Sequence, residues 1–188
     1  VNLGVIAYRK NEHQIALAHF QKALELDANN SLAHANIAAV SLRFRDYARA
    51  QKAFEKAIAL GIVNCNTLSG LGYSLEGLQQ GAPAIAQLEK AYALCPSERK
   101  LLFDQGSICM TQLRDNQCAI KNFGEFIAAN PDLAKDHPVF GYMQSLKTSP
   151  EPQKAEPPAD AQDPTKTEEP VAAPTESSIY AHGVGAVQ

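Results

Sequence analysis

Four cysteines are the residues whose type could support covalent or metal chemistry in this sequence. They are Cys65, Cys95, Cys109 and Cys118, at successive spacings of 30, 14 and 9 residues. Structural zinc sites pair cysteines that are separated by about two to four residues, so these spacings do not predict a metal site. The cysteines are interpreted as disulfide partners or as four separate thiols that behave as small apolar residues.

The other residue types that perform catalysis are not arranged for it. The five histidines are scattered along the chain, and His34 falls at a helix-packing position that suits a half-buried core histidine. No glycine-rich phosphate loop follows a strand pattern. The sequence therefore predicts no catalytic residue, no bound metal and no cofactor.

The charge of the chain argues against two classes of partner. Residues 1–148 carry 15 Lys and Arg against 13 Asp and Glu, and residues 149–188 carry 2 against 7. Nucleic-acid binders usually show a clustered basic face, which this balance does not indicate. No apolar run is long enough to cross a bilayer. We expect no nucleic-acid binding and no direct membrane insertion by this segment.

The elements that position these residues are helical hairpins. Residues 31–64 hold two helical patterns joined by a short polar turn, and Ala50, Phe54 and Ala57 recur at steps of three and four on one face of the second pattern. Asp46 precedes that second pattern and is predicted to be its N-cap. Residues 31–64 therefore predict a helix–turn–helix unit.

This unit repeats along the chain. Shifted by 34 residues it matches residues 1–30 (whose first positions are missing) and 65–98, and it matches 99–133 with the later positions displaced by one. The displacement predicts a turn that is one residue longer near residues 113–117. A self-similar period of this length indicates a solenoid.

The end of the chain differs from the repeats. Residues 134–147 predict a capping helix that begins near Pro138, with Val139, Phe140, Met143 and Leu146 as its apolar stripe. Residues 148–188 are rich in proline, alanine and glutamate, and we predict that they form a disordered tail. The expected domains are thus an array over 1–147 and a tail over 148–188.

The repeat pattern resembles a known family. Leu3-Gly4, Ala16, Phe20 and Ala23, with their counterparts in the later repeats, follow the pattern of the tetratricopeptide repeat over roughly residues 1–133. The sequence departs from that pattern by having no tryptophan at the fourth position. The resemblance implies an all-α fold, a right-handed α-α superhelix, with the capping helix and tail after it.

The resemblance also implies a concave groove that is lined by the first helix of each repeat and binds protein segments. Carried onto this chain, the groove residues are Val1, Val5, Tyr8, Leu32, Ala35, Asn36, Ala39, Leu42, Asn66, Ser69, Tyr73, Glu76, Lys100, Phe103, Ser107 and Met110. Chaperone-binding members hold a C-terminal carboxylate with a set of polar groove residues. At the corresponding positions of this chain, only Asn36 keeps the family's residue type. Carboxylate clamping is therefore not expected, and the groove suits a helix or extended peptide with apolar anchors.

The hairpins suggest pairings for the cysteines. Cys65 and Cys95 fall where the first helix of the third repeat begins and its second helix ends, so they are expected at one end of that hairpin. Cys109 and Cys118 flank the turn at the opposite end of the fourth hairpin. Two disulfides would favour an oxidising compartment, whereas four free thiols would not.

We predict a non-catalytic adaptor or scaffold that binds a partner peptide or helix, in assembly of a bacterial envelope, pilus or secretion complex. The alternatives are a cytosolic chaperone for an apolar segment of a secreted protein, a self-associating homo-oligomeric scaffold, and a regulatory appendage of an enzyme whose catalytic domain lies upstream. Val1 begins inside a helical pattern, so we expect a fragment or processed form. Compartment is left open, with a lean toward the periplasm or cell envelope over the cytoplasm.

Overall fold

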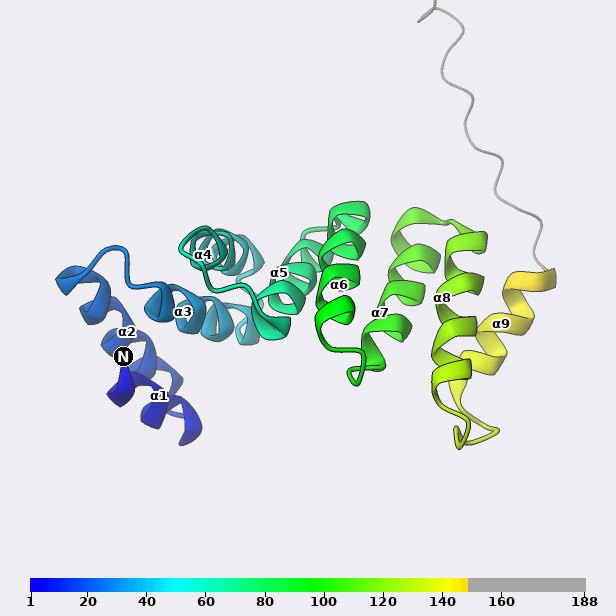
Figure 1. Cartoon of the computed structure of the whole chain (residues 1–188), viewed down its shortest axis with the longest axis horizontal. Helices are drawn as coiled ribbons and strands as arrows, with labels where there is room; N and C mark the ends of the chain where they lie inside the picture. The colour runs from blue at the N-terminus through cyan, green and yellow to red at the C-terminus, as the bar shows by residue number, and fades with distance from the viewer. Residues whose placement is uncertain (149–188) are drawn as a thin grey trace, which may run out of the picture. The chain divides into compact units, whose positions relative to one another are not determined.

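The structure, a computed structural model, describes residues 1–148, which fold into α-helices and one π-helical segment without any strand. Figure 1 shows the helices following one another in chain order along the array. The helix bounds are α1 Asn2–Arg9, α2 His13–Leu26, α3 Ser31–Arg43, α4 Tyr47–Ala59, α5 Cys65–Gly77, α6 Gly81–Leu94, α7 Lys100–Ile108, the π-helical segment η1 Cys109–Leu113, α8 Asn116–Ala129 and α9 Pro138–Thr148.

The helices form four antiparallel pairs, which we number as repeats one to four: α1–α2, α3–α4, α5–α6 and α7–α8. Polar N-cap side chains stand at the start of several of these helices. The Asn30 side chain accepts a hydrogen bond from the backbone N–H of Ala33 at 3.0 Å, and Asp46, as predicted, accepts from that of Arg49 at 3.2 Å. Such caps satisfy backbone donors that have no partner inside the helix.

The turn inside each pair places one residue in the left-handed region. These residues are Asn11, Arg45, Gln79 and Arg114, with φ between 53° and 62°. Their spacing is 34, 34 and 35 residues, which follows the sequence period and its single extra residue in repeat four. All four turns therefore contain one residue with a left-handed backbone conformation.

Close approach of the two helices in a pair depends on a small residue that faces a large one. A Cβ on Gly4 would come within 2.5 Å of the Phe20 ring, and one on Gly106 would come within 2.5 Å of Phe123. Ala38, fully buried, holds the same position in repeat two. The small residue lets the backbones approach, and the large side chain fills the space beside the crossing.

The extra residue of repeat four lies in the helix and not in the turn. The predicted longer turn near residues 113–117 is wrong, because the first helix instead widens into the π-helix η1, Cys109–Leu113. The N–H of Asp115 consequently bonds to the carbonyl of Cys109, whereas in repeat two the N–H of Asp46 bonds to Ser41, one residue closer in sequence. A single-residue insertion is commonly absorbed in this way.

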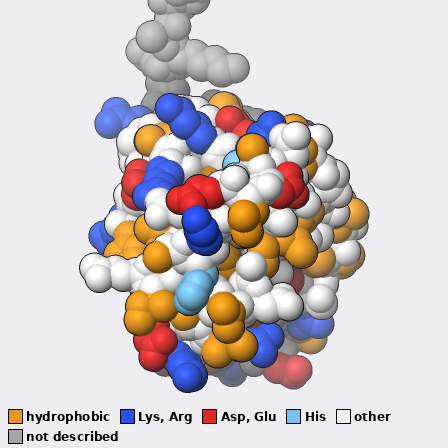
Figure 2. Space-filling view, turned by 90° about the vertical axis from the view of Figure 1, so that its left-hand side faces the viewer, with side chains coloured by type: hydrophobic (Ala, Val, Ile, Leu, Met, Phe, Trp, Pro, Cys, Tyr) orange, Lys and Arg blue, Asp and Glu red, His pale blue; other side chains and the backbone are white. Residues whose placement is uncertain are grey.

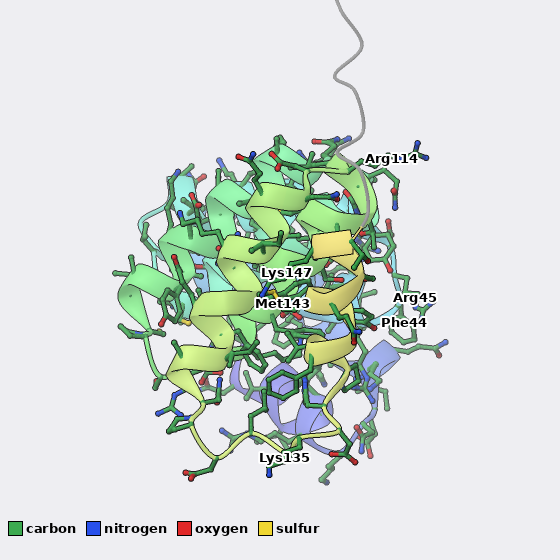
Figure 3. All side chains as sticks on the ribbon, turned by 90° about the vertical axis from the view of Figure 1, so that its right-hand side faces the viewer. Phe44, Arg45, Arg114, Lys135, Met143 and Lys147 are labelled. Carbon is green, nitrogen blue, oxygen red and sulfur yellow. A yellow bond between two sulfur atoms is a disulfide. The ribbon has the colours of Figure 1, made fainter. Side chains whose placement is uncertain are left out.

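Helix α9 packs on α8 and covers the end of the array. Val139 and Leu146 are buried, whereas Phe140 and Tyr142 are both partly exposed, at 38% and 36%. The Tyr142 ring nevertheless lies 5.8 Å from that of Phe123. Figure 3 views this end, with Met143 and Lys147 on α9. The predicted tail lies outside the described residues, and within residues 1–148 no helix is long and apolar enough to span a membrane.

Candidate functional site

A hollow of about 640 Å³ lies between the first helices of repeats one to three. Nine of the predicted groove residues line it together: Tyr8, Leu32, Ala35, Asn36, Ala39, Leu42, Asn66, Ser69 and Tyr73. The residues of α3 and those of α5 meet here because the two helices lie side by side in the array. Tyr8 of α1 completes the wall.

The floor of the hollow is largely apolar and is formed by small residues over an aromatic ring. Gly70 lets the Phe54 ring pack directly against α5, since a Cβ at Gly70 would collide with that ring, and Phe54 is buried beneath the hollow at 4% exposure. Ala35 and Ala39 leave space along α3, and Leu32 is 57% exposed at its rim. An apolar side chain of a ligand could be buried here.

Three asparagine side chains line the same hollow and differ in the hydrogen bonds that they make. Asn64 is fixed, because it forms a capping box with Thr67 at the start of α5. The Asn36 side chain donates to the Leu32 carbonyl at 2.7 Å, which leaves its oxygen without a partner in residues 1–148. The Asn66 amide makes no hydrogen bond within the described residues. Asn36 and Asn66 can therefore pair with the backbone of a bound segment.

A second hollow of about 720 Å³ adjoins the first and shares Leu42, Arg43 and Tyr73 with it. It is more polar, being lined also by Arg45, Glu76, Gln79 and Gln112. Neither Arg43 nor Arg45 forms an ion pair within residues 1–148. Figure 3 labels Phe44 and Arg45 in the turn after α3, where the Phe44 ring lies 5.7 Å from that of His13.

The two hollows meet at a hydrogen-bonded group on α5 and α7. The Tyr73 hydroxyl donates to Asp104 at 2.7 Å, and the Lys100 ammonium bonds to both Asp104 oxygens at 2.6 Å. Burial, and then this hydrogen bond, raise the pKa of Tyr73 far above its usual range. The tyrosine is therefore a fixed, neutral hydrogen-bonding wall and not an acid at physiological pH.

Glu76 is a half-buried carboxyl beside that group. Burial, followed by repulsion from the Asp104 carboxylate, raises its pKa above the ordinary value, and Lys100 opposes the shift. Its backbone carbonyl accepts a hydrogen bond from the Gln112 amide at 2.9 Å, which ties η1 to α5. A hydrogen-bond donor from a ligand would therefore be favourable beside the Glu76 carboxyl.

Six predicted groove residues line neither hollow: Val1, Val5, Lys100, Phe103, Ser107 and Met110. Val1 lies by the α1–α2 hairpin, and Lys100 bonds to Asp104 as described above. Phe103 packs in an aromatic cluster, with ring centroids 5.5 Å from Phe123, 5.4 Å from Phe126 and 6.3 Å from Tyr142, so its placement in an open groove is wrong. Val5 and Met110 pack against the core. Ser107 does not line either hollow, and its carbonyl accepts a hydrogen bond from Thr111 at 2.8 Å.

Six lining residues were not predicted. They are Arg43, Phe54, Ile62, Asn64, Thr67 and Gly70. Phe54 and Gly70 carried a signal, because a large residue at a helix crossing and a glycine on the facing helix allow the two helices to pack closely. The others sit at helix ends, where a rule based on first-helix positions gives no information.

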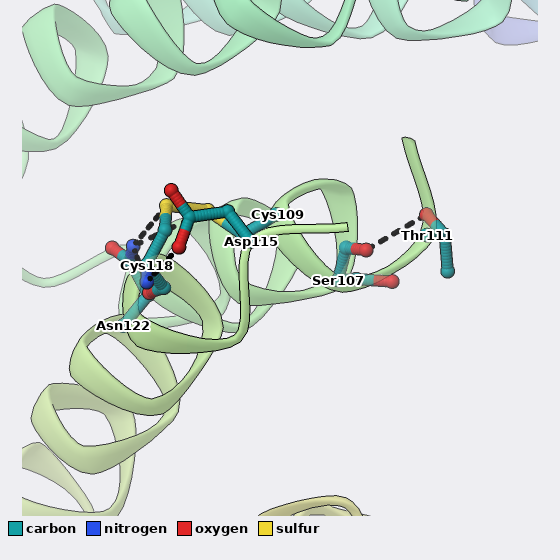
Figure 4. Close-up of a disulfide and its surroundings, with 6 residues drawn as sticks. All are labelled: Ser107, Cys109, Thr111, Asp115, Cys118 and Asn122. Carbon is teal, nitrogen blue, oxygen red and sulfur yellow. Dashed lines mark hydrogen bonds between the residues drawn. A yellow bond between two sulfur atoms is a disulfide. The ribbon is translucent and has the colours of Figure 1, made fainter. Parts of the chain in front are cut away.

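The four cysteines divide into two different pairs. Cys109 and Cys118 form a disulfide with their Cα atoms 5.6 Å apart, and Asn122 donates to the Cys118 carbonyl at 2.9 Å beside it (Figure 4). Cys65 and Cys95 carry free thiols, so the second expected bridge is not formed in the structure. Burial and the adjacent Cys95 thiol raise the pKa of Cys65 to about 11, which keeps that thiol protonated.

Within residues 1–148 no group of three or more His, Cys, Asp or Glu side chains is arranged to hold a metal ion.

Comparison with known proteins identifies the repeat. The family model for the tetratricopeptide repeat matches residues 1–30, which form α1 and α2. The chain is a tetratricopeptide-repeat protein. It is 28% identical over 144 residues to anaphase-promoting complex subunit 3 of Schizosaccharomyces pombe (strain 972), covering 77% of this tetratricopeptide-repeat chain and 21% of that relative. The chain thus spans about a fifth of the relative's length.

Solved structures share the fold of this tetratricopeptide-repeat protein. YrrB, described as a TPR protein with an unusual peptide-binding site, superposes with a TM-score of 0.68 at 26% identity, over 78% of this chain and 73% of YrrB. MamA superposes with a TM-score of 0.69 at 18% identity, over 78% and 79%. At that lower identity, MamA shows the fold alone.

Proposed function

We propose that this tetratricopeptide-repeat protein is a non-catalytic adaptor that binds an extended peptide segment of a partner protein between α3 and α5. The single observation that carries the proposal is the hollow in which nine predicted groove residues meet. Repeat solenoids use such surfaces for protein–protein interaction.

The chemistry of the hollow supports a peptide with apolar anchors. Leu32, Ala35 and Ala39 offer apolar contact, which gives affinity when a ligand side chain is buried. The Asn36 and Asn66 amides can pair with backbone groups of an extended segment, which must find hydrogen-bond partners when water is displaced. YrrB, similar at 26% identity, is described as having a peptide-binding site, which is consistent with this use.

The wider role is proposed from two further facts. The Cys109–Cys118 disulfide supports an oxidising compartment, which suits assembly of an envelope, pilus or secretion complex better than a cytosolic chaperone role. The Schizosaccharomyces pombe relative is named as a subunit of a multi-subunit complex, which is consistent with a scaffold. A regulatory appendage of an enzyme would use the same groove.

The test uses peptides selected from a random phage-displayed library with the full chain as bait. Affinity of one selected peptide is then measured by fluorescence anisotropy for the wild type, Leu32→Glu and Leu94→Glu. The two leucines are matched, being 57% and 55% exposed, but Leu32 lies in the groove and Leu94 on the outer side of α6.

Leu32→Glu is expected to weaken binding by about a hundredfold, because a carboxylate would have to be desolvated against an apolar ligand side chain. Leu94→Glu should bind as the wild type does. Equal affinity of Leu32→Glu and the wild type, or loss of binding in Leu94→Glu alone, would contradict the groove.

A further inference from the structure

The wall of the second hollow carries more positive than negative charge. Its charged lining residues are Arg43, Arg45 and Glu76, and its other lining residues are neutral. No carboxylate of residues 1–148 lies within ion-pair distance of either arginine, and neither arginine side chain forms a hydrogen bond with the helices that the structure describes. The hollow therefore presents two guanidinium groups that no acidic group of the described chain neutralises.

Two carboxylates close to the arginines, in sequence or in the wall, are engaged differently. Asp46 follows Arg45 directly, but it caps α4 and accepts the N–H of Arg49 at 3.2 Å. Burial raises the pKa of Glu76, the Lys100 ammonium lowers it, and neither arginine contributes to the shift. The two guanidinium groups are therefore available to a bound ligand.

Two basic residues at this turn distinguish repeat two from its neighbours. Arg9 and Asn11 hold the same two positions in repeat one, and Gly77 and Gln79 hold them in repeat three. The turn follows α3, and Arg43 lines both the peptide groove and the second hollow. The positive charge thus lies where the groove continues into the second hollow.

Basic side chains elsewhere on the surface are accompanied by acidic ones. Figure 2 looks onto the end of the array that holds α1, where Lys and Arg side chains lie among Asp and Glu side chains. On α2, Lys22 pairs with Glu25 at 2.7 Å. An exposed basic residue alone therefore distinguishes no surface of this chain, whereas two unpaired arginines beside a ligand groove do.

We propose that the segment bound between α3 and α5 carries an acidic side chain, Asp or Glu, that pairs with Arg43 and Arg45 in the second hollow. The inference rests on the proposed peptide-binding function and adds a second, charged anchor to the apolar one. Charge complementarity selects this occupant, because a guanidinium group binds a carboxylate through two parallel N–H bonds. An acidic anchor would also fix the direction in which the segment lies along α3.

The length of α3 sets the spacing between the two anchors. At the rise of an α-helix, Arg43 lies about 16 Å along the axis from Leu32 and about 6 Å from Ala39. An extended segment covers about 3.3 Å per residue, so the acidic residue is expected about two to five residues from the apolar anchor. Peptides selected by the full chain from the random display library should share an Asp or Glu at one such spacing.

Fluorescence anisotropy at low ionic strength measures the pairing with one selected peptide and its copy in which the acidic residue is replaced by the amide. Arg43→Gln/Arg45→Gln should weaken binding of the acidic peptide by about fivefold, because the pair is partly exposed to solvent. The amide peptide should bind the wild type about fivefold more weakly and should lose little more in the double variant. The difference between the two peptides should shrink in high salt.

Arg9→Gln/Arg114→Gln is the matched control. Arg9 holds the Arg43 position in repeat one and Arg114 holds the Arg45 position in repeat four, and both are exposed and line neither hollow. This variant makes the same change in net charge and should bind the acidic peptide as the wild type does. Glutamine fits the turn, since Gln79 adopts a φ of 60° there in repeat three, and circular dichroism should show an unchanged helical fold.

Selected peptides without a shared acidic residue would overturn the proposal. So would equal affinity of wild type and Arg43→Gln/Arg45→Gln for the acidic peptide, or an equal loss in Arg9→Gln/Arg114→Gln. A single-stranded oligonucleotide that displaces the peptide only when both arginines are present would assign the charge to a nucleic-acid ligand instead. If Leu32→Glu weakens binding while the arginine variant does not, the groove stands and the acidic anchor fails; if Leu32→Glu has no effect, the groove itself fails.

Discussion

The first helices of repeats two and three border an open hollow, whereas the first helix of repeat four borders a filled aromatic cluster. The contrast is sharpest at one repeat position, which is held by Ala35, Ser69 and Phe103 at spacings of 34 residues. Ala35 and Ser69 line the hollow, and Phe103 packs against Phe123 and Phe126. The same position of the repeat thus lines an open hollow in one half of the array and packs into an aromatic cluster in the other.

The neighbour on the C-terminal side decides which role the position takes. Tyr142 of α9 and His137 just before it approach the Phe103 ring, at 6.3 Å and 5.7 Å between centroids. No comparable aromatic residues cover Ala35 or Ser69 within the described residues. Large side chains that meet one another close the surface, and small ones leave it open.

Phe103→Ala should show the largest effect, a loss of about 3 kcal/mol in the free energy of unfolding, because it leaves a cavity among Phe123, Phe126 and Tyr142. Urea denaturation followed by circular dichroism measures it. Ser69→Ala at the equivalent position should change stability by less than about 0.5 kcal/mol. Equal losses in the two variants would remove the distinction between the two halves.

The disulfide strengthens the same half of the molecule. Cys109→Ala/Cys118→Ala should lower the free energy of unfolding by about 2.5 kcal/mol, the entropic estimate for a short closed loop. Mass spectrometry of alkylated, unreduced protein should find two modified cysteines, Cys65 and Cys95. Four modified cysteines in protein isolated without reductant would rule out the bridge. If no cysteine were modified, Cys65 and Cys95 would form a second disulfide in repeat three.

A large side chain placed in the hollow between α3 and α5 should weaken peptide binding. Ser69→Phe should weaken binding of a selected peptide by about tenfold, because the ring occupies the hollow as Phe103 does in repeat four. Ala93→Phe, on the outer side of α6, is the control and should bind normally. Fluorescence anisotropy gives both affinities. Undiminished binding by Ser69→Phe would show that the ligand does not enter this hollow.

The smallest expected effect concerns Glu76, at the border of the two halves. Its folded-state pKa is raised, so the folded chain holds this proton more tightly than the unfolded chain, and the carboxyl lowers stability progressively as pH rises above its ordinary pKa of 4.5. Glu76→Gln should therefore stabilise the protein at pH 7 by less than about 1 kcal/mol, since solvent screens a half-exposed group.

Below pH 4 the Glu76→Gln variant and the wild type should unfold at the same denaturant concentration, because both side chains are then neutral. Glu89→Gln, at an exposed position on α6, is the control and should behave as the wild type at both pH values. Destabilisation by Glu76→Gln at pH 7 would mean that the ionised carboxylate is held by a favourable partner.

The sequence predicts much of this fold because its small and large residues recur at a constant spacing. Gly4 against Phe20 and Gly106 against Phe123 place the helix crossings, and Asp46 begins α4 as expected. The period does not say where an extra residue goes. A longer turn and a π-helix both accommodate it, and the structure adopts η1, from which Gln112 reaches the Glu76 carbonyl.

The groove was predictable only in part for a related reason. Residue type at positions such as Ala39 and Tyr73 indicates which face of α3 and α5 turns inward, and these residues do line the hollow. Whether a large side chain offers a ligand contact or fills the core depends on residues far along the chain. Phe103 is closed off by α9 and the residues before it, and nothing in the sequence of α7 alone encodes that contact.

Photo-cross-linking tests the central claim, that ligands bind in the open half of the array, most directly. A peptide selected from the display library would carry a benzophenone side chain at its apolar anchor, and mass spectrometry would locate the cross-linked residue on the full chain. The account predicts cross-links within residues 32–42 of α3 and 66–73 of α5. Cross-links confined to α7 and α9, or to the outer helices α4 and α6, would contradict it.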